Sequence, residues 1–184
     1  MSEAAALPSA TDVIAFWRQA GPERWFEKDA AFDDEIRRRF LRLHEAAASG
    51  KLTAWEANTE GALALLILLD QFPRNMFRGS ARAFASDPLA RAIASRAILN
   101  GFDGAFPDMR NFFYLPFEHS EDLADQERGL TLYKAAGDAD NLKWGEIHAD
   151  IIRRFGRFPH RNAVLGRVST PEEQEFLDDG GFAG

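Results

Sequence analysis

Two short segments of the chain, residues 72–79 and 158–162, each contain a Phe-Pro pair followed closely by an arginine and an asparagine. Because proline does not continue a helix that precedes it, both segments are expected just past a helix end, where side chains can reach a ligand. The forked guanidinium group of arginine matches carboxylate and phosphate groups, so the segments predict one polar site built from remote parts of the chain. They contribute Arg74, Asn75, Arg78, His160, Arg161 and Asn162.

Three more side chains are candidates for this site: Asp70, His119 and His148. Asp70 follows the apolar run Ala62–Leu69 on the side expected to be buried, where a carboxylate needs a cationic partner or a proton. A structural ion pair and a role in binding a ligand both fit this carboxylate. Its candidate cationic partners are Arg74, Arg78 and Arg161.

The histidines allow more than one interpretation. His148 shares a helix face with Ile151, which fits either a hydrogen-bonded histidine of the core or a ligand-binding side chain. His160 lies in an arginine-rich turn without acids, so its neutral form is favoured; it could exchange a proton with an anionic ligand or hold a backbone carbonyl. His119 stands at an expected loop-to-helix junction beside Ser120, which is first a helix cap and only second a nucleophile.

No metal site and no cofactor are predicted. His119, His148 and the carboxylates of Glu118 and Glu121 could gather, but no segment has the pair of ligands four residues apart that is typical of a zinc-binding helix. Glycine-rich phosphate loops and Gly-x-Ser-x-Gly turns are missing from the sequence. The catalytic residues are therefore unknown, and whether the protein is an enzyme stays open.

The charge of the chain argues against nucleic acid as a partner. The formal net charge is −7 at pH 7, and an acidic protein repels the phosphate backbone. Against this background two stretches, 71–86 and 151–171, contain arginines and no acids. Such local basic stretches favour a small anion or a short acidic segment as partner over general attraction to a polyanion.

Length and composition favour a globular, cytoplasmic protein. The 184 residues are 46% hydrophobic, which is enough for a substantial core in one domain. The longest apolar run, Ala62–Leu69, is too short to cross a bilayer, and the N-terminus lacks the pattern of a signal peptide, so no membrane association is expected. The sequence has no cysteine, which excludes disulfides and thiolate chemistry.

The elements that position these side chains are expected to be helices almost throughout. Apolar residues recur with helical spacing, and alternating β-branched runs are missing. The stretch through Ala62–Leu69 is apolar on all sides and should be the central, buried helix. The predicted helices are Thr11–Gly21, Asp29–Ser49, Thr53–Pro73, Asp87–Gly101, Asp108–Phe117, Ser120–Ala136, Asp138–Phe155 and one that starts at Thr170. The expected N-terminal caps include Thr11, Thr53, Asp87 and Ser120.

The spacing of prolines supports a repeated arrangement of these helices. Pro73, Pro116 and Pro159 lie 43 residues apart, in the range of two-helix repeats, and each follows a large apolar residue. We therefore expect an all-α fold of stacked antiparallel helical hairpins, similar to tetratricopeptide repeats or an irregular α-solenoid bundle. No Pro-, Gly- and Ser-rich linker divides the chain, so residues 11–184 are expected to form one domain after a flexible segment 1–10.

Three stretches of the sequence together resemble a bacterial family. They are Leu69–Gly79, Leu115–Asp122 and Arg154–Asn162, and they are similar to the signature stretches of the family called domain of unknown function 924. The resemblance covers residues 13–181. It implies an all-helical fold similar to tetratricopeptide-like hairpins, and it implies no activity and no catalytic residue.

Two functions and one architectural alternative remain open. The first function is binding of a small anionic or zwitterionic ligand in a pocket lined by arginine and histidine. The second is a tetratricopeptide-like interaction module whose arginines grip an acidic or carboxylate-bearing peptide. In the architectural alternative the arginines only fasten helix ends to acidic segments. An enclosed polar pocket favours the small ligand, an open groove favours the peptide, and arginines saturated by Asp and Glu favour architecture.

Overall fold

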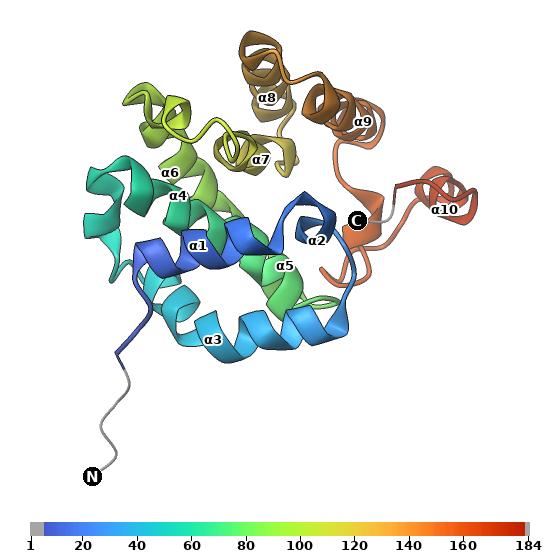
Figure 1. The fold of residues 1–184 in the computed structure, drawn as a ribbon. Helices are drawn as coiled ribbons and strands as arrows, with labels where there is room; N and C mark the ends of the chain where they lie inside the picture. The colour runs from blue at the N-terminus through green and yellow to red at the C-terminus, as the bar shows by residue number, and fades with distance from the viewer. Residues whose placement is uncertain (1–5, 183–184) are drawn as a thin grey trace. The chain divides into compact units, whose positions relative to one another are not determined.

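The computed structural model describes residues 6–182, and this part of the chain is all-helical, without strands, as the sequence predicts (Figure 1). The α-helices are α1 (Ala10–Ala20), α2 (Pro22–Trp25), α3 (Ala30–Ala48), α4 (Thr59–Leu66), α5 (Phe72–Met76), α6 (Asp87–Leu99), α7 (Asn111–Glu118), α8 (Leu123–Ala136), α9 (Ala139–Phe155) and α10 (Pro171–Asp178). Short 3₁₀ turns cover Thr53–Ala57, Ala81–Phe84, Phe102–Gly104 and Pro159–Arg161, and a π-helical turn covers Ile67–Gln71.

Contacts within the chain divide it into two compact units. Unit 1 comprises the residues up to Arg78 together with Arg82–Pro116, and unit 2 comprises Gly79–Ala81 and the residues from Phe117 onward. One boundary falls inside α7, beside its internal proline. The expectation of one domain over residues 11–184 and the stacking of hairpins stay predictions. Residues 1–5 of the predicted flexible segment lie outside the described residues.

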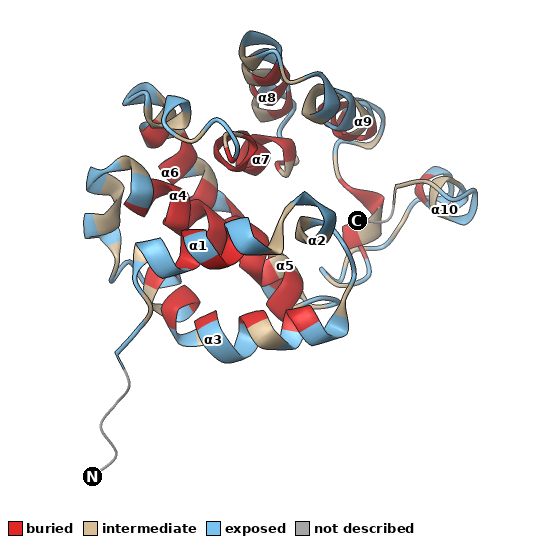
Figure 2. Cartoon of the chain, in the orientation of Figure 1, coloured by how far each residue is buried: buried red, intermediate tan, exposed pale blue. Residues whose placement is uncertain are grey.

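The centre of unit 1 is the apolar stretch that runs from α4 through the π-helical turn into α5. Every residue in 61–73 is buried (Figure 2). This stretch is in contact with α1, α3 and α6. Around Phe72, the rings of Phe16, Trp17 and Phe40 lie 6.1, 5.5 and 4.9 Å away between centroids. The predicted central, buried helix is therefore confirmed.

Two predicted caps in unit 1 are displaced by one or two residues. Ser9 caps α1 and forms a reciprocal capping box with Asp12. Thr11, the predicted cap, instead donates its hydroxyl hydrogen to Glu60 at 2.9 Å. The residue before α6 is Ser86 rather than Asp87, which becomes the first residue of the helix.

The predicted helix Thr53–Pro73 begins later than expected. Thr53 donates its hydroxyl hydrogen to the carbonyl of Gly50 at 2.6 Å, and only a 3₁₀ turn follows. Asn58 is the N-cap of α4, because its side chain accepts a hydrogen bond from the amide of Gly61 at 2.9 Å. The glycine is required at this position, since a Cβ on Gly61 would overlap the carbonyl group of Trp55.

The π-helical turn alters the hydrogen bonding of the central helix. The amide of Phe72 donates to the carbonyl of Ile67, five residues back, rather than to that of Leu68. The Leu68 carbonyl is bound instead by Nδ1 of His44, from α3, at 2.8 Å. A side chain from a different helix therefore satisfies a buried backbone group, as the low polarity of the core demands.

Pro73 leaves a second backbone carbonyl of the central helix without its helical hydrogen-bond donor. Proline has no N–H, so the Leu69 carbonyl has no donor four residues later. Ser86 supplies one, because its hydroxyl donates to that carbonyl at 2.6 Å. Ser86 consequently does not cap α6 with its side chain.

Unit 2 contains a hairpin of α8 and α9, which lie side by side (Figure 1). Gly137 ends α8 in the left-handed conformation, with φ of 69°, and Asp138, where the next helix was predicted to start, caps α9. On α9, a Cβ at Gly145 would lie 3.1 Å from Leu130 and 3.4 Å from Tyr133. The glycine therefore permits the close approach of the two helices.

The start of α8 differs from the prediction, whereas that of α10 agrees with it. Asp122 caps α8 by accepting a hydrogen bond from the amide of Ala124 at 2.8 Å. Ser120, the predicted cap, donates its hydroxyl hydrogen to Asp125 at 2.7 Å. Thr170 forms a capping box at the start of α10.

Candidate functional site

In unit 1 the first Arg-Asn pair lies within a helix, not past a helix end as predicted. Pro73 occupies the first turn of α5, where a missing N–H costs little, so the helix continues to Met76. Arg74 and Asn75 therefore project from helical backbone in the buried centre of the unit.

Arg74 connects two carboxylates. Its Nη1 lies 3.3 Å from Oδ1 of Asp70, and its Nη1 and Nη2 bind the two oxygens of Asp87 at 3.0 and 3.1 Å. Burial alone would lower the pKa of the Arg74 guanidinium, but the two carboxylates raise it above the ordinary value. The guanidinium is therefore charged, and the predicted ion pair of Asp70 with a neighbouring arginine is confirmed.

Asn75 and Arg78 bind a third carboxylate, that of Asp33 on α3. The Asn75 amide donates to Oδ1 at 2.7 Å, while Nε and Nη2 of Arg78 bind both oxygens at 2.8 and 3.0 Å. Bidentate pairing of this kind fixes the end of α5 to α3. It supports the architectural alternative for the first segment.

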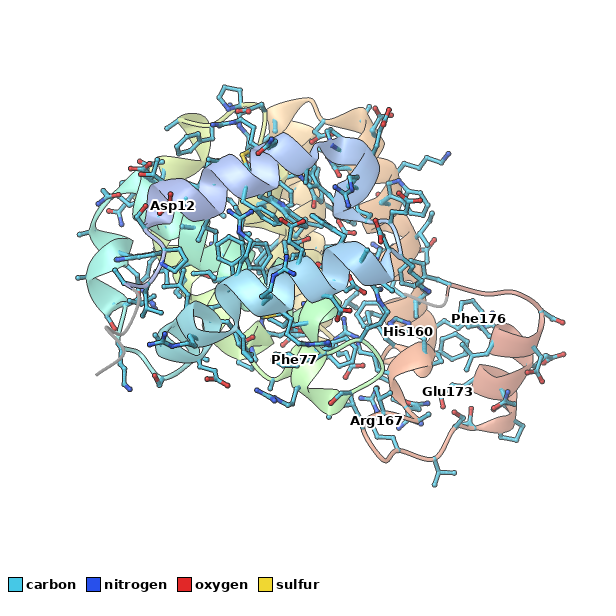
Figure 3. The ribbon with its side chains drawn as sticks, turned by 60° about the horizontal axis from the view of Figure 1, so that its bottom comes forward. Asp12, Phe77, His160, Arg167, Glu173 and Phe176 are labelled. Atoms are coloured by element: carbon cyan, nitrogen blue, oxygen red, sulfur yellow. The ribbon has the colours of Figure 1, made fainter. Side chains whose placement is uncertain are left out.

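In unit 2 the second Arg-Asn pair lies past a helix end, as predicted. α9 ends at Phe155, and the pair follows in and just after the 3₁₀ turn Pro159–Arg161. Asn162 donates to Oε2 of Glu173 at 3.1 Å. Glu173, on α10 and labelled in Figure 3, also accepts two hydrogen bonds from Arg157 at 2.6 and 2.8 Å. The hydrogen bonds from Arg157 lower the pKa of Glu173 to about 2.

A second ion pair of unit 2 fastens the loop that follows. Arg167 binds both oxygens of Glu121 at 2.7 and 2.9 Å and donates to the carbonyl of Phe158 at 3.2 Å. The amide of Phe158 donates to the same carboxylate at 2.8 Å. Burial would raise the pKa of Glu121, but the hydrogen bonds from Arg167 and Phe158 lower it below its ordinary value.

Three predicted site residues of unit 2 pack against one buried ring, that of Phe158. The ring centroids of His148 and His160 lie 5.6 and 5.5 Å from its centroid, and the guanidinium of Arg161 lies 4.5 Å from it. The ring of His119 lies 6.3 Å from that of His148. We call His119, His148 and His160, with Phe158, the imidazole cluster.

His148 is oriented by two acceptors. Its Nδ1 lies 2.9 Å from the carbonyl of Trp144 and 3.1 Å from Oε1 of Glu118. Because a backbone carbonyl can only accept, Nδ1 carries a proton. Tyr133 donates to the other oxygen of Glu118 at 2.9 Å, which fixes the carboxylate in turn. A buried imidazole held by a carboxylate is an arrangement suited to proton transfer.

An aromatic side chain near the C-terminus borders the imidazole cluster. The ring of Phe182 lies 4.5 Å from that of His148 and 5.3 Å from that of His160, between centroids. Phe182 is only partly buried and packs on the small core formed by Ile151, Ile152 and Phe158. It therefore packs against two imidazoles of the cluster.

The structure gathers the predicted residues in two groups. Asp70, Arg74, Asn75 and Arg78 belong to unit 1, and His119, His148, His160, Arg161 and Asn162 belong to unit 2. Their union in one site stays a prediction. The carboxylates that hold the first group were not predicted, because nothing local in the sequence marks Asp33 or Asp87 as their partners. Glu118 was predicted only as a possible metal ligand, and nothing local marks it as the partner of the remote His148.

The described part of the chain shows neither a set of metal ligands nor a membrane-spanning helix. In residues 6–182, no group of three or more His, Cys, Asp and Glu side chains is arranged to hold a metal ion. Over the same residues, no helix has both the length and the apolar character needed to span a membrane.

The all-helical fold and its signature stretches agree with comparisons to known proteins. The family model described as bacterial protein of unknown function (DUF924) matches residues 13–181, so the chain belongs to this family. A solved structure of a protein of unknown function from Agrobacterium tumefaciens is similar, with 52% sequence identity and a TM-score of 0.89. The similarity covers 93% of this chain and 97% of that chain. Among curated proteins, none matches.

Proposed function

We propose that unit 2 binds a small anionic or zwitterionic ligand at the imidazole cluster. The observation that carries the proposal is the packing of His148, His160 and Arg161 against the single ring of Phe158. An apolar wall with a few convergent polar groups is typical of small-molecule sites.

Two other arginines of this region form ion pairs that hold the fold of unit 2 together. Arg157 is bound by Glu173 and Arg167 by Glu121, each through two hydrogen bonds. The imidazoles are different, because they are the groups whose charge changes near neutral pH. The chain has four histidines, and all but His44 belong to the cluster. His148 is buried and the other two imidazoles are half-buried, and placing titratable groups so beside a small core is unfavourable unless they are used, which favours function over packing.

The charges of the cluster suit both classes of ligand. An anionic group would accept hydrogen bonds from the guanidinium of Arg161 and from imidazole N–H groups. The ammonium group of a zwitterion would form an ion pair with the carboxylate of Glu118, which lies beside His148. Because imidazoles can both donate and accept protons, the cluster is compatible with catalysis as well as with binding.

A thermal-shift screen tests the proposal. Phosphorylated metabolites, carboxylates, amino acids and sulfate are each added to the wild type, to His160→Asn and to Arg161→Lys. A ligand at about a hundred times its dissociation constant stabilises the folded protein by about 2.7 kcal/mol, which is a shift of several degrees in this size range. We expect at least one compound to produce such a shift in the wild type and a smaller one in both variants.

Arg153→Ala is the matched control, because Arg153 is an exposed arginine of α9 paired with Asp150 at 2.7 Å. It should respond to the ligand as the wild type does. A shift that is equal in all four proteins would contradict the proposed site. A shift produced only by acidic peptides would favour the interaction module instead.

A further inference from the structure

A hollow of about 390 Å³ lies in unit 1 between the end of α3 and the start of α6. Its volume falls within the range of small-molecule sites, roughly 300–1,000 Å³. None of its residues was predicted to bind a ligand. The polar side chains that line it are His44, Glu45, Ser49, Arg82 and Ser86.

His44 is the buried polar group of this hollow, with 6% of its surface exposed. Its Nδ1 lies 2.8 Å from the carbonyl of Leu68, and the ring packs 5.5 Å from that of Phe77. A carbonyl can only accept, so Nδ1 carries a proton and the neutral ring has its lone pair on Nε2. Among the described residues no hydrogen bond reaches Nε2, so this acceptor is unused.

The charge state of His44 agrees with this tautomer. Burial lowers the pKa of His44, and the positive charge of Arg82 lowers it further, against the opposite effects of the Leu68 carbonyl and Glu45. The ring is therefore neutral at pH 7, and Nε2 is an acceptor there.

The two serine hydroxyls of the hollow also present acceptors. Ser86 donates its hydrogen to the Leu69 carbonyl at 2.6 Å, and Ser49 donates to the Ala46 carbonyl at 3.1 Å. Their lone pairs remain to receive hydrogen bonds. Together with the carboxylate of Glu45, these hydroxyls make the wall of the hollow rich in hydrogen-bond acceptors. Arg82 contributes a positive charge to the same wall, and its Nη2 lies 3.6 Å from Glu45.

We propose that this hollow binds a small zwitterion of the amino-acid class. The ammonium group donates hydrogen bonds to Nε2 of His44, to Ser86 and to Glu45, and the carboxylate group binds Arg82. A ligand with only an anionic group would be repelled by the hydrogen-bond acceptors of the wall. A ligand with only an ammonium group would form no ion pair with Arg82. The hollow belongs to unit 1, so the inference does not depend on the function proposed for unit 2.

Two-bond proton–nitrogen NMR of the imidazole rings measures binding directly. The chain has four histidines, and the ring that disappears in His44→Asn is that of His44. L-alanine is titrated into the wild type, with propionate and ethylamine as probes that lack the ammonium or the carboxylate. We expect L-alanine to shift the Nε2 resonance of His44 saturably, with an affinity at least tenfold above that of either probe.

His44→Asn separates binding from folding. The asparagine amide can donate to the Leu68 carbonyl as Nδ1 does, but it has no counterpart of Nε2. The variant should therefore melt near the wild-type temperature and bind L-alanine at least tenfold more weakly by calorimetry. Arg82→Gln should reduce the affinity for L-alanine to that for ethylamine.

Three results would overturn the inference. They are an Nε2 resonance of His44 that stays in place up to saturating L-alanine, equal binding of propionate and L-alanine, and undiminished binding by folded His44→Asn. The same spectra report on the imidazole cluster through the rings of His119, His148 and His160. A ligand that shifts only those rings supports the function proposed for unit 2 and contradicts the site in unit 1.

Discussion

Among single residues, the arginines of segment 72–79 form ion pairs with carboxylates from other elements of unit 1. Arg74 has carboxylate partners on both sides, and their side chains are almost fully buried, with 1% exposed for Asp70 and 7% for Asp87. Buried charges of this kind are costly when one partner is removed, because the remaining charge cannot return to water. The set therefore acts as one ionic network.

Asp70→Asn tests that network. The change removes one of the two nearly fully buried negative charges beside the half-buried Arg74 guanidinium, so we expect a loss of about 2–3 kcal/mol in the free energy of unfolding, measured by urea denaturation. Asp108→Asn is the control, because Asp108 pairs with Arg18 on the surface, where such pairs contribute about 0–1 kcal/mol. Equal effects of the two substitutions would show that the Asp70 pair is not isolated from solvent.

His44 makes the stability of unit 1 depend on pH. Its folded pKa lies below the ordinary value of 6.5, so the unfolded chain takes up the proton more readily as the pH falls. The contribution of His44 is complete above pH 6.5 and is lost as the pH falls toward the folded pKa. Arg82 and Glu45 are the charged groups beside the ring.

Denaturation midpoints of wild type and His44→Asn at pH 7.5 and 5.5 measure this dependence. The wild type should lose more stability than the variant, because asparagine does not titrate. If both proteins lose the same amount, His44 titrates normally in the folded state.

At the level of elements, close packing sets the position of α4. Gly61 passes the backbone of Trp55 so closely that a Cβ would lie 2.8 Å from the Trp55 carbonyl carbon. Backbone cannot yield as a flexible side chain can, so Gly61→Ala should destabilise the protein by about 1–3 kcal/mol despite the better helix propensity of alanine.

Gly129→Ala on α8 is the matched control for this prediction. Its Cβ would be 3.5 Å from Phe117, an ordinary contact. The gain in helix propensity, up to about 1 kcal/mol, should then appear as a neutral or raised melting temperature. A stabilising Gly61→Ala would mean that the Trp55 segment moves away at little cost.

The start of α10 is fastened through Glu173. With a folded pKa of about 2 against an ordinary 4.5, the carboxylate stabilises unit 2 above pH 4.5, and this contribution is lost as the pH falls from 4.5 to about 2. Glu173→Gln should therefore cost about 1–2 kcal/mol at pH 7, since Arg157 is partly exposed. The difference from wild type should shrink below pH 4.5 in acid unfolding curves. A difference that does not change with pH would locate the effect in packing.

Across the whole molecule, local signals in the sequence predict most helices and one ion pair. The helices predicted to start at Asp29, Asp138 and Thr170 begin there, and each of these residues caps its helix by accepting a hydrogen bond from an amide two or three residues ahead. The pairing of Asp70 with Arg74 is similarly local, since the two lie one helical turn apart.

Features that depend on remote residues could not be predicted. Asp33, which holds Arg78, lies 45 residues away in sequence. The π-helical turn depends on a donor from α3, because the Leu68 carbonyl needs His44 once it loses its helical partner. The imidazole cluster depends on the loop after α9 packing back on that helix, which no spacing of residues reveals.

The division of the chain between the units has a practical consequence for dissecting the protein into fragments. The backbone passes between the units after Arg78, after Ala81 and after Pro116, so neither unit is a continuous stretch of sequence. A fragment that begins at Phe117 lacks Gly79–Ala81 and starts inside α7, with its first helical turn incomplete. Proteases cut where the chain unfolds locally, and the boundary at Pro116 lies inside α7, where the backbone is helical. Functions of the two units are therefore better separated by point substitutions than by truncation.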